Sequence, residues 1–265
     1  MNGKGKNELS GSRERLDRLL VTRGLFATRS RAADAIRRGH VRVEGCIVRK
    51  PGEKVSVTAR ITTDDPALPY VSRAALKLLA GLKAWPVDLS GAVCLDVGAS
   101  TGGFVQVLLR HGAQRVYAVD VGHGQLHPDL ARDARVISLE GVNARRLDAA
   151  LIPEPVDVIT ADVSFISLRK ALPAALSLAR PGARLWALVK PQFEVGPEGI
   201  GRGGVVEDEA MRRQAVADIA AFLEGQGWQV AGHVPSPIAG AEGNREFLIH
   251  AVNGRQARGA ADRPR

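Results

Sequence analysis

The chain of 265 residues is 45% hydrophobic and 25% charged, which is enough to bury one medium-sized core and a second, smaller one. No apolar run approaches the roughly 20 residues that a membrane-spanning helix needs. The hydrophilic start MNGKGKNELSGSRER contains no signal-peptide core. These features predict a cytoplasmic protein without a membrane partner.

The net charge of +9 is concentrated at the two ends of the chain. Residues 1–60 hold 15 Lys and Arg against 6 Asp and Glu, and residues 253–265 hold four Arg against one Asp. The segment between them is slightly acidic. Because so many cations within 60 residues suit a phosphate backbone, the N-terminal part predicts a nucleic-acid partner.

After a start at residues 1–12 that we expect to be disordered, residues 13–60 predict a small domain of two helices and a hairpin. Apolar residues recur at helical spacing before Gly24, and Thr28 can cap a second helix that ends at Gly39. Two short runs of β type within residues 41–48 flank a Glu-Gly pair, which favours a hairpin.

Arginines gather on and around these elements and form a compact candidate site for RNA phosphates. The predicted RNA-binding residues are Arg15, Arg18, Arg29, Arg31, Arg37, Arg38 and Arg42. The segment resembles the S4 RNA-binding domain in three motifs: RLD at 15–17, TRSRA at 28–32 and GHVRVEG at 39–45. A stretch without periodicity and with two prolines follows, and it predicts a linker over residues 61–70.

Residues 71–252 alternate between helical and strand patterns, which predicts an α/β domain with a doubly wound, mostly parallel sheet. The last two apolar runs lie close together in the sequence and can pair antiparallel. The expected strands are 93–97, 116–119, 136–139, 156–161, 185–189, 228–234 and 247–252. The expected helices are 74–82, 103–110, 168–179 and 208–224.

The segment LDVGASTGGF, residues 95–104, predicts a buried strand that leads into a glycine-rich turn and a helix. Such a turn lies outside the carboxyl end of the first strand, where open α/β sheets bind ligands. Its GxxxGG spacing differs from the GxGxxG of dinucleotide sites. Asp96 would oppose a pyrophosphate but suits a cationic ligand with an amino group, so we expect S-adenosylmethionine. Asp120, at the end of VYAVD, can accept both hydroxyls of an adenosine ribose.

Three charged residues stand at the ends of otherwise apolar strands: Asp162, Lys190 and Glu246. Because the carboxyl ends of parallel strands meet at one edge, the first two should lie beside the cofactor turn. Glu246 begins the last strand, and it reaches the same edge if that strand is antiparallel. A lysine flanked by carboxylates can orient or deprotonate an alcohol, and Lys77 is a candidate second cation.

Two other acceptor classes lack their usual signals. Methylation of an exocyclic amine goes with an [ND]-P-P-[YF] pattern, whereas Val-Ser-Phe follows Asp162. Carbon methylation of a pyrimidine needs a nucleophilic cysteine, but Cys94 lies inside the first strand. A hydroxyl group is therefore the expected acceptor. Neither Cys46 nor Cys94 has the spacing of a metal ligand, so no metal is expected.

The whole chain resembles the TlyA (hemolysin A) family, which comprises ribosomal RNA cytidine-2′-O-methyltransferases with an FtsJ/RrmJ-like catalytic domain. The matching motifs, besides those of the S4-like domain, are YVSR at 70–73, KL at 77–78, LDVGASTGGF, AVDVG at 118–122, NAR at 143–145, ADVSFIS at 161–167, VKPQFE at 189–194 and SPI…GN-x-EFL at 236–248. The resemblance implies a Rossmann-like methyltransferase domain with a seven-stranded sheet whose last strand is antiparallel.

The resemblance also implies the site residues. The family's K-D-K-E catalytic tetrad falls on Lys77, Asp162, Lys190 and Glu246, with Lys190 acting on the ribose 2′-hydroxyl. The implied S-adenosylmethionine site comprises Asp96, Gly98, Ser100, Gly102, Gly103, Asp120 and Asn143. The implied partners are ribosomal RNA or ribosomal subunits, and we expect the protein to be a monomer.

Two alternative functions come from other classes. The haemolysin label implies a membrane-active protein, although the sequence has no export signal and no amphipathic membrane helix of note. The second alternative is an S4 RNA-binding factor with an inactive methyltransferase domain, against which the intact tetrad argues. The extra basic tail, residues 253–265, is expected to be disordered.

Overall fold

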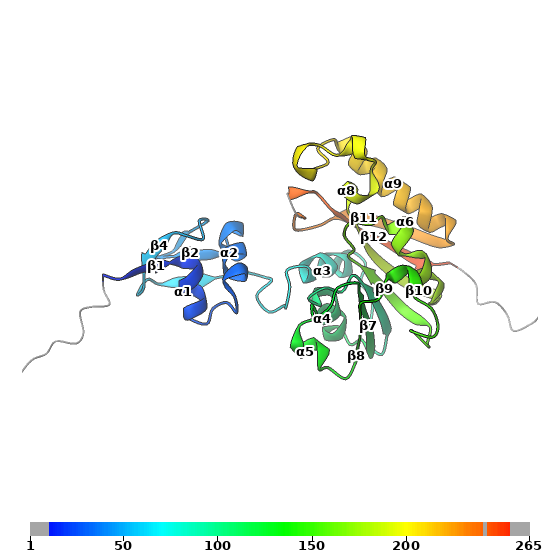
Figure 1. Ribbon diagram of the computed structural model, residues 1–265, viewed down its shortest axis with the longest axis horizontal. Helices are drawn as coiled ribbons and strands as arrows, with labels where there is room; N and C mark the ends of the chain where they lie inside the picture. Colours follow the sequence, from blue (N-terminus) through cyan, green and yellow to red (C-terminus); the bar gives the residue numbers. More distant parts are fainter. Residues whose placement is uncertain (1–10, 241–242, 255–265) are drawn as a thin grey trace, which may run out of the picture. The chain divides into compact units, whose positions relative to one another are not determined.

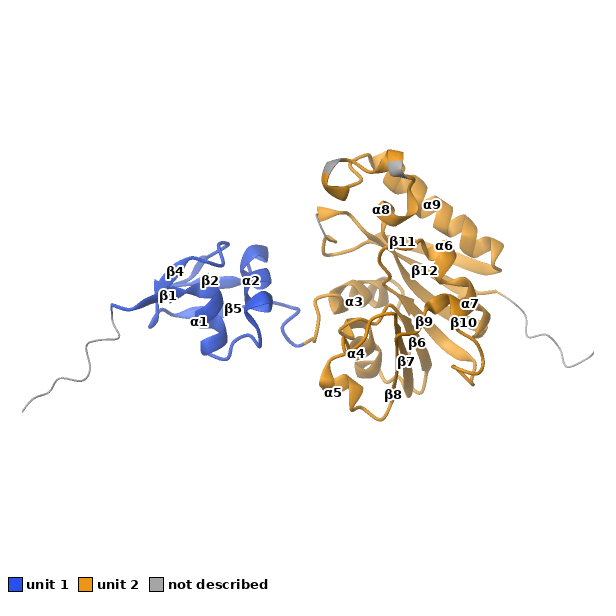
Figure 2. Cartoon of the chain, viewed as in Figure 1, with its two compact units in different colours: residues 1–69 blue, residues 70–265 orange. Residues whose placement is uncertain are grey.

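The computed structural model describes residues 11–240 and 243–254, and it divides the chain into two units, Met1–Pro69 and Tyr70–Arg265 (Figure 2). The expected disorder at residues 1–12 and 253–265 therefore concerns segments that lie outside the described residues, apart from Gly11, Ser12, Asn253 and Gly254. The predicted fold class is confirmed, with a small α+β unit followed by a large α/β unit.

The first unit contains two short helices and two small antiparallel sheets. Its elements are β1 (Arg13–Arg15), α1 (Leu16–Thr22), α2 (Arg29–Arg38), β2 (Val41–Val43), β3 (Cys46–Ile47), β4 (Lys54–Ser56) and β5 (Ile61–Thr63). The Thr28 hydroxyl accepts a hydrogen bond from the backbone N–H of Arg31, and Gly39 ends α2 with φ of 83°. Both predicted ends of this helix are thus confirmed.

The predicted hairpin is present as β2 and β3. Glu44 and Gly45 both have positive φ, 50° and 81°, as a tight two-residue turn between twisted strands requires. The predicted linker, however, starts too early. Residues 61–63 form β5, which pairs with β2, so they belong to the small unit. The pairing partner lies twenty residues away, and local composition does not reveal it.

The second unit is built on a seven-stranded sheet with the order β11-β12-β10-β9-β6-β7-β8. Its strands are β6 (Val93–Val97), β7 (Arg115–Asp120), β8 (Val136–Glu140), β9 (Val156–Ala161), β10 (Ala179–Val189), β11 (Trp228–Pro235) and β12 (Phe247–Asn253). The first five are mutually parallel, and β12 runs antiparallel to both of its neighbours. The predicted antiparallel last strand is confirmed.

Helices cover both faces of this sheet, as a doubly wound fold requires (Figure 1). One apolar cluster joins the strands to α6 (Leu168–Ala171), α7 (Pro173–Ser177) and α9 (Glu209–Gly225). The other joins them to α3 (Ala75–Ala84), α4 (Gly103–Arg110) and α5 (Pro128–Ala131). Shorter helical segments are η1 (Ala144–Arg146), α8 (Pro191–Glu194), η2 (Pro197–Gly199) and η3 (Arg202–Gly204).

Two predicted boundaries in this unit are wrong. The single helix expected over 168–179 is divided into α6 and α7, because Pro173 lacks the N–H that would continue α6. The chain then enters β10 already at Ala179. The expected tail also begins too early, since Asn253 pairs with Trp228 as the last residue of β12. Its side-chain amide also bonds the carbonyls of Ala179 and Arg180.

Candidate functional site

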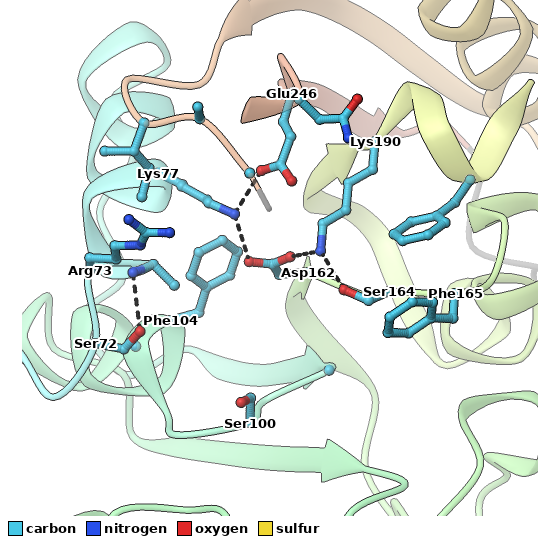
Figure 3. A pocket seen from close by; sticks show the side chains of 18 of the residues that line it. Ser72, Arg73, Lys77, Ser100, Phe104, Asp162, Ser164, Phe165, Lys190 and Glu246 are labelled. Atoms are coloured by element: carbon cyan, nitrogen blue, oxygen red, sulfur yellow. Dashed lines mark hydrogen bonds and ion pairs between the residues drawn. The ribbon is translucent and has the colours of Figure 1, made fainter. Parts of the chain in front are cut away.

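The carboxyl ends of the parallel strands, the start of β12 and helix α3 surround one pocket of about 510 Å³ (Figure 3). Strand β6 leads into the glycine turn, β9 leads to Asp162, and β10 leads to Lys190. Glu246 directly precedes β12, and Lys77 comes from the first turn of α3. The sheet order therefore brings residues from five segments to one place.

The four residues of the predicted tetrad form a continuous chain of alternating charge. Lys77 Nζ lies 2.8 Å from Glu246 Oε2 and 3.3 Å from Asp162 Oδ2. Lys190 Nζ lies 2.6 Å from Asp162 Oδ1. Asp162 thus bridges the two lysines with its two oxygens, and Figure 3 shows all four side chains directed toward one another.

These charges are largely removed from solvent, since Lys77 and Lys190 are each only 7% exposed. Burial acts to raise the pKa of the Asp162 carboxyl, but the ammonium groups of Lys77 and Lys190 outweigh burial and hold this pKa below its ordinary value. Asp162 is consequently ionised at neutral pH and fixes the directions of both lysines.

Ser164 is a further contact of the tetrad that the sequence did not reveal. Its hydroxyl oxygen lies 2.8 Å from Lys190 Nζ and accepts a hydrogen bond from it. Together with Asp162, it occupies two of the three N–H donors of the Lys190 ammonium. Within residues 11–240 and 243–254 this nitrogen has no third partner, which leaves one donor for a group that enters the pocket.

The glycine turn has the backbone that its sequence predicts. Gly98 and Gly102 have φ of 86° and 94°, and Ser100, between them, has φ of 46°. A Cβ at Gly98 would come within 2.5 Å of the Asp162 carbonyl oxygen, and one at Gly102 would come within 2.4 Å of Leu130. The positive φ favours glycine at both positions, and at Gly98 the Asp162 backbone also leaves no space for a Cβ.

Asp96 lies in β6, just before this turn, and only one of its two carboxylate oxygens has a hydrogen-bond partner among the described residues. The Thr160 hydroxyl donates to Asp96 Oδ1 at 2.7 Å, whereas Oδ2 is buried and has no hydrogen-bond partner among the described residues. Burial, with a smaller contribution from nearby carboxylates, raises the pKa of Asp96 to about 7. Because Asp96 borders the pocket, this unsatisfied oxygen suits a cationic or hydrogen-bond-donating ligand.

The structure divides the predicted cofactor residues into two groups. Those that line the pocket are Asp96, Gly98, Ser100 and Gly103, whereas Gly102, Asp120 and Asn143 are not among the lining residues. Asp120 instead supports the turn, since its carboxylate accepts the N–H groups of Ser100 and Gly122, each at 2.8 Å. Asn143 caps η1 by accepting the backbone N–H of Arg145.

Phe165 also lines the pocket, and it is unusual in two ways. The residue is 91% exposed, and its φ of 64° is rare for a bulky residue. The ring lies 5.2 Å from that of Phe193, measured between centroids. Phe165 was not among the predicted site residues, although its position three residues after a strand-end aspartate was a signal.

The predicted RNA-binding arginines of the first unit also fall into two groups. Five are exposed: Arg15, Arg18, Arg29, Arg37 and Arg42. Two are half-buried and hold the chain that follows β5. Arg31 donates to the carbonyls of Ala67 and Leu68, and Arg38 forms an ion pair with Asp65. Arg15, Arg18 and Arg29 also pair with carboxylates of this unit, so internal bonds do not exclude RNA contacts. The assignment of all seven arginines to RNA stays a prediction.

Two further properties of the described residues concern membrane-spanning helices and metal sites. No helix within 11–240 and 243–254 is long and apolar enough to cross a membrane. In the same part of the chain, no group of three or more His, Cys, Asp or Glu side chains is arranged to hold a metal ion.

Comparisons with known proteins agree with this geometry. The profile of the FtsJ-like methyltransferase family matches residues 70–253, and that of the S4 domain matches residues 14–61. A Mycobacterium tuberculosis protein named 16S/23S rRNA (cytidine-2′-O)-methyltransferase TlyA is 45% identical over 89% of this chain and 89% of its own length. Hemolysin A of Brachyspira hyodysenteriae is 37% identical over 90% of this chain and 99% of its own length.

A solved structure from Streptococcus thermophilus, provisionally called a hemolysin, has a TM-score of 0.72 and 39% sequence identity. The match covers 91% of this chain and 88% of that one. The relatives therefore share both units and not only the common sheet. The chain belongs to the FtsJ-like methyltransferase family and, within it, to the TlyA group, in which an S4 domain precedes the catalytic domain.

Proposed function

We propose that this protein transfers a methyl group from S-adenosylmethionine to the 2′-hydroxyl of a cytidine ribose in ribosomal RNA. The observation that carries the proposal is the pair of ion pairs Lys77–Asp162 and Asp162–Lys190, which lie in the pocket that the glycine turn also lines. The names of the relatives support the substrate class, since the TlyA protein of M. tuberculosis is named for this reaction.

The residues present fit S-adenosylmethionine. Gly98 lines the pocket at a point where a Cβ would collide with the Asp162 carbonyl oxygen, and the unsatisfied oxygen of Asp96 suits the amino group of a cationic ligand. Asp120, fixed by two backbone N–H groups, still has lone pairs for a ribose hydroxyl. When bound, the cofactor supplies an electrophilic methyl group on a sulfonium.

The protein's part in the reaction is to bind and orient the acceptor. Lys190 is held by Asp162 and Ser164, so its nitrogen meets the ribose hydroxyl in a fixed direction. As an ammonium it orients the acceptor oxygen for in-line attack, and as a neutral amine it also takes the hydroxyl proton. Lys77 and Glu246 complete the charge chain and keep Asp162 in place.

The exposed arginines of the first unit supply the RNA contacts in this proposal. Arg15 and Arg29 share the carboxylate of Asp17, at 2.9 Å and 3.0 Å, and both retain exposed guanidinium surface. Phe165 offers an aromatic face for a nucleotide base at the pocket. A monomeric, cytoplasmic protein is part of the same proposal.

Mapping of ribose methylation tests the proposal directly. Ribosomal RNA from cells with and without the protein would be compared nucleotide by nucleotide, and the missing 2′-O-methyl group should lie on cytidine. Purified protein with labelled S-adenosylmethionine should restore it on ribosomal subunits from the deficient cells. Identical methylation maps in the two strains would contradict the proposal.

A further inference from the structure

The loop of residues 163–167, between β9 and α6, carries two of the pocket's contacts in a strained conformation. It presents Ser164 to Lys190 and Phe165 to the pocket, with Phe165 in the left-handed region. A bulky residue keeps such a backbone only where its surroundings over-determine it. Some group outside the tetrad must therefore hold this loop.

Glu194 fixes the C-terminal end of the loop. The Ser167 hydroxyl donates to Glu194 Oε2 at 2.5 Å, and the backbone N–H of Leu168 donates to Oε1 at 2.8 Å. Ser167 is at the same time the N-cap of α6, since its oxygen accepts the N–H of Arg169 at 3.2 Å. One carboxylate thus fixes both the end of the loop and the start of the helix.

The surroundings of Glu194 suit a structural brace. The residue is only 8% exposed. Burial raises the pKa of its carboxyl, although the bonds from Ser167 and Leu168 partly oppose that rise. Arg169 adds a bond from its guanidinium to the Glu194 carbonyl oxygen at 3.3 Å. Both carboxylate oxygens accept bonds from the loop and the helix, and Glu194 is not among the residues that line the pocket, so it acts through these contacts.

The near end of the loop is tied to the same short segment. Lys190 stands directly before α8 and bonds Asp162 and Ser164, whereas Glu194 is the last residue of α8. Between Lys190 and Glu194 in the sequence, the ring of Phe193 lies 5.2 Å from that of Phe165, measured between centroids. Residues 190–194 therefore contact the loop at Ser164, Phe165 and Ser167.

We propose that Glu194 is a positioning residue for methyl transfer, which holds the 163–167 loop so that Ser164 aligns Lys190 and Phe165 faces the acceptor nucleotide. This inference rests on the proposed function, because the loop has a task only if an acceptor enters the pocket. Glu194 makes no contact with the cofactor in this proposal. The predicted cofactor residues that line the pocket lie in β6, in the turn after it and at the start of α4, whereas Glu194 lies in α8, after β10.

Alanine and glutamine variants separate positioning from folding. Glu194→Ala removes both acceptors and should lower kcat for RNA methylation about 10- to 100-fold, as expected for a misplaced catalytic group. Glu194→Gln keeps one carbonyl oxygen for Leu168 and an amide that can bond the Ser167 hydroxyl, so it should stay within about threefold of the wild type. The affinity for S-adenosylmethionine, measured calorimetrically, should not change in either variant.

Glu154→Ala is the matched control. This carboxylate accepts a bond from the Tyr117 hydroxyl at 2.8 Å and pairs with Arg115, at the opposite edge of the sheet. It should lower thermal stability but leave kcat unchanged. Should Glu194→Ala fail to fold, Ser167→Ala removes a single donor and should still lower kcat with the same unchanged cofactor affinity.

A double-mutant cycle with Phe165→Ala tests the route of the effect. If Glu194 acts through the loop, the double variant should be no slower than the slower single variant. Independent, multiplicative losses would overturn the inference, and so would wild-type kcat in a folded Glu194→Ala protein. A wild-type protein that methylates no RNA would instead overturn the proposed function, so the two failures are distinguishable.

Discussion

Asp17 in the first unit and Asp162 in the second each bridge two cations, and these two bridges differ in burial. In the first unit, Asp17 joins Arg15 and Arg29, whose side chains are 50% and 57% exposed. In the second, Asp162 joins Lys77 and Lys190, whose side chains are each 9% exposed. The exposed pair can reach an external polyanion, whereas the buried pair can serve only what enters the pocket.

The difference shows how one arrangement of charges serves two tasks. Planar arginine groups at the surface suit phosphates and are screened by salt. Lysines in a buried cluster are screened much less, and their carboxylate partners determine their directions. RNA binding should therefore depend on Arg15 and Arg29, and methyl transfer should depend on Lys77 and Lys190. This separation is open to experiment.

The largest expected effect belongs to Lys190. Lys190→Ala should lower the rate of methylation about 1,000-fold or more, because it removes the group that orients or deprotonates the acceptor. Affinities for S-adenosylmethionine and for ribosomal subunits should change less than about twofold. If this variant loses RNA binding to the same degree as activity, the exposed arginines and the buried lysines do not have separate roles.

The reverse pattern is expected for the exposed pair. Arg15→Ala together with Arg29→Ala should weaken binding to ribosomal RNA about tenfold and lower the salt dependence of binding by roughly one unit of slope per arginine. The rate at saturating RNA should be retained. Arg132→Ala, at an exposed arginine of the second unit paired with Asp129, is the control and should change neither quantity.

A smaller effect of pH follows from Asp96, whose pKa is raised to about 7. Above this pH the carboxylate is ionised and attracts a cationic ligand, whereas below it the neutral acid does not. The affinity for S-adenosylmethionine should therefore rise several-fold between pH 6 and pH 8. Titration calorimetry of Asp96→Asn should show a flatter profile, and an equally steep one would exclude Asp96 as the source.

The smallest effect concerns Asp17. The hydrogen bond from Arg15, together with Arg29, lowers the pKa of Asp17 to about 2. Since its folded pKa is depressed, its contribution to stability is present above its ordinary pKa, near 4, and is lost as the pH falls toward 2. The difference in Tm between the wild type and Asp17→Asn should shrink over this range. A difference that stays constant down to pH 2 would contradict the assigned ion pairs.

Much of this molecule was predictable because its signals are local. The apolar runs indicated every strand of the large sheet, and Thr28 and Gly39 indicated both ends of α2. Asp162 and Lys190 were recognisable as strand-end charges because parallel strands share one carboxyl edge, and Glu246 because the antiparallel last strand begins at that edge. The errors came where a distant partner decided the outcome, as at residues 61–63, which look like a linker but pair with β2.

The sequence by itself determined the two-unit organisation, the doubly wound sheet, the glycine turn and the four charged residues of the tetrad. These features depend on periodicity, turn chemistry and motif spacing, all of which act over a few residues. The tertiary structure alone decided that Ser164 supports Lys190, that Glu194 holds the 163–167 loop, and that Arg31 and Arg38 bind their own chain. Such contacts join residues about 26 to 37 positions apart, so they follow from the tertiary fold and not from any local pattern.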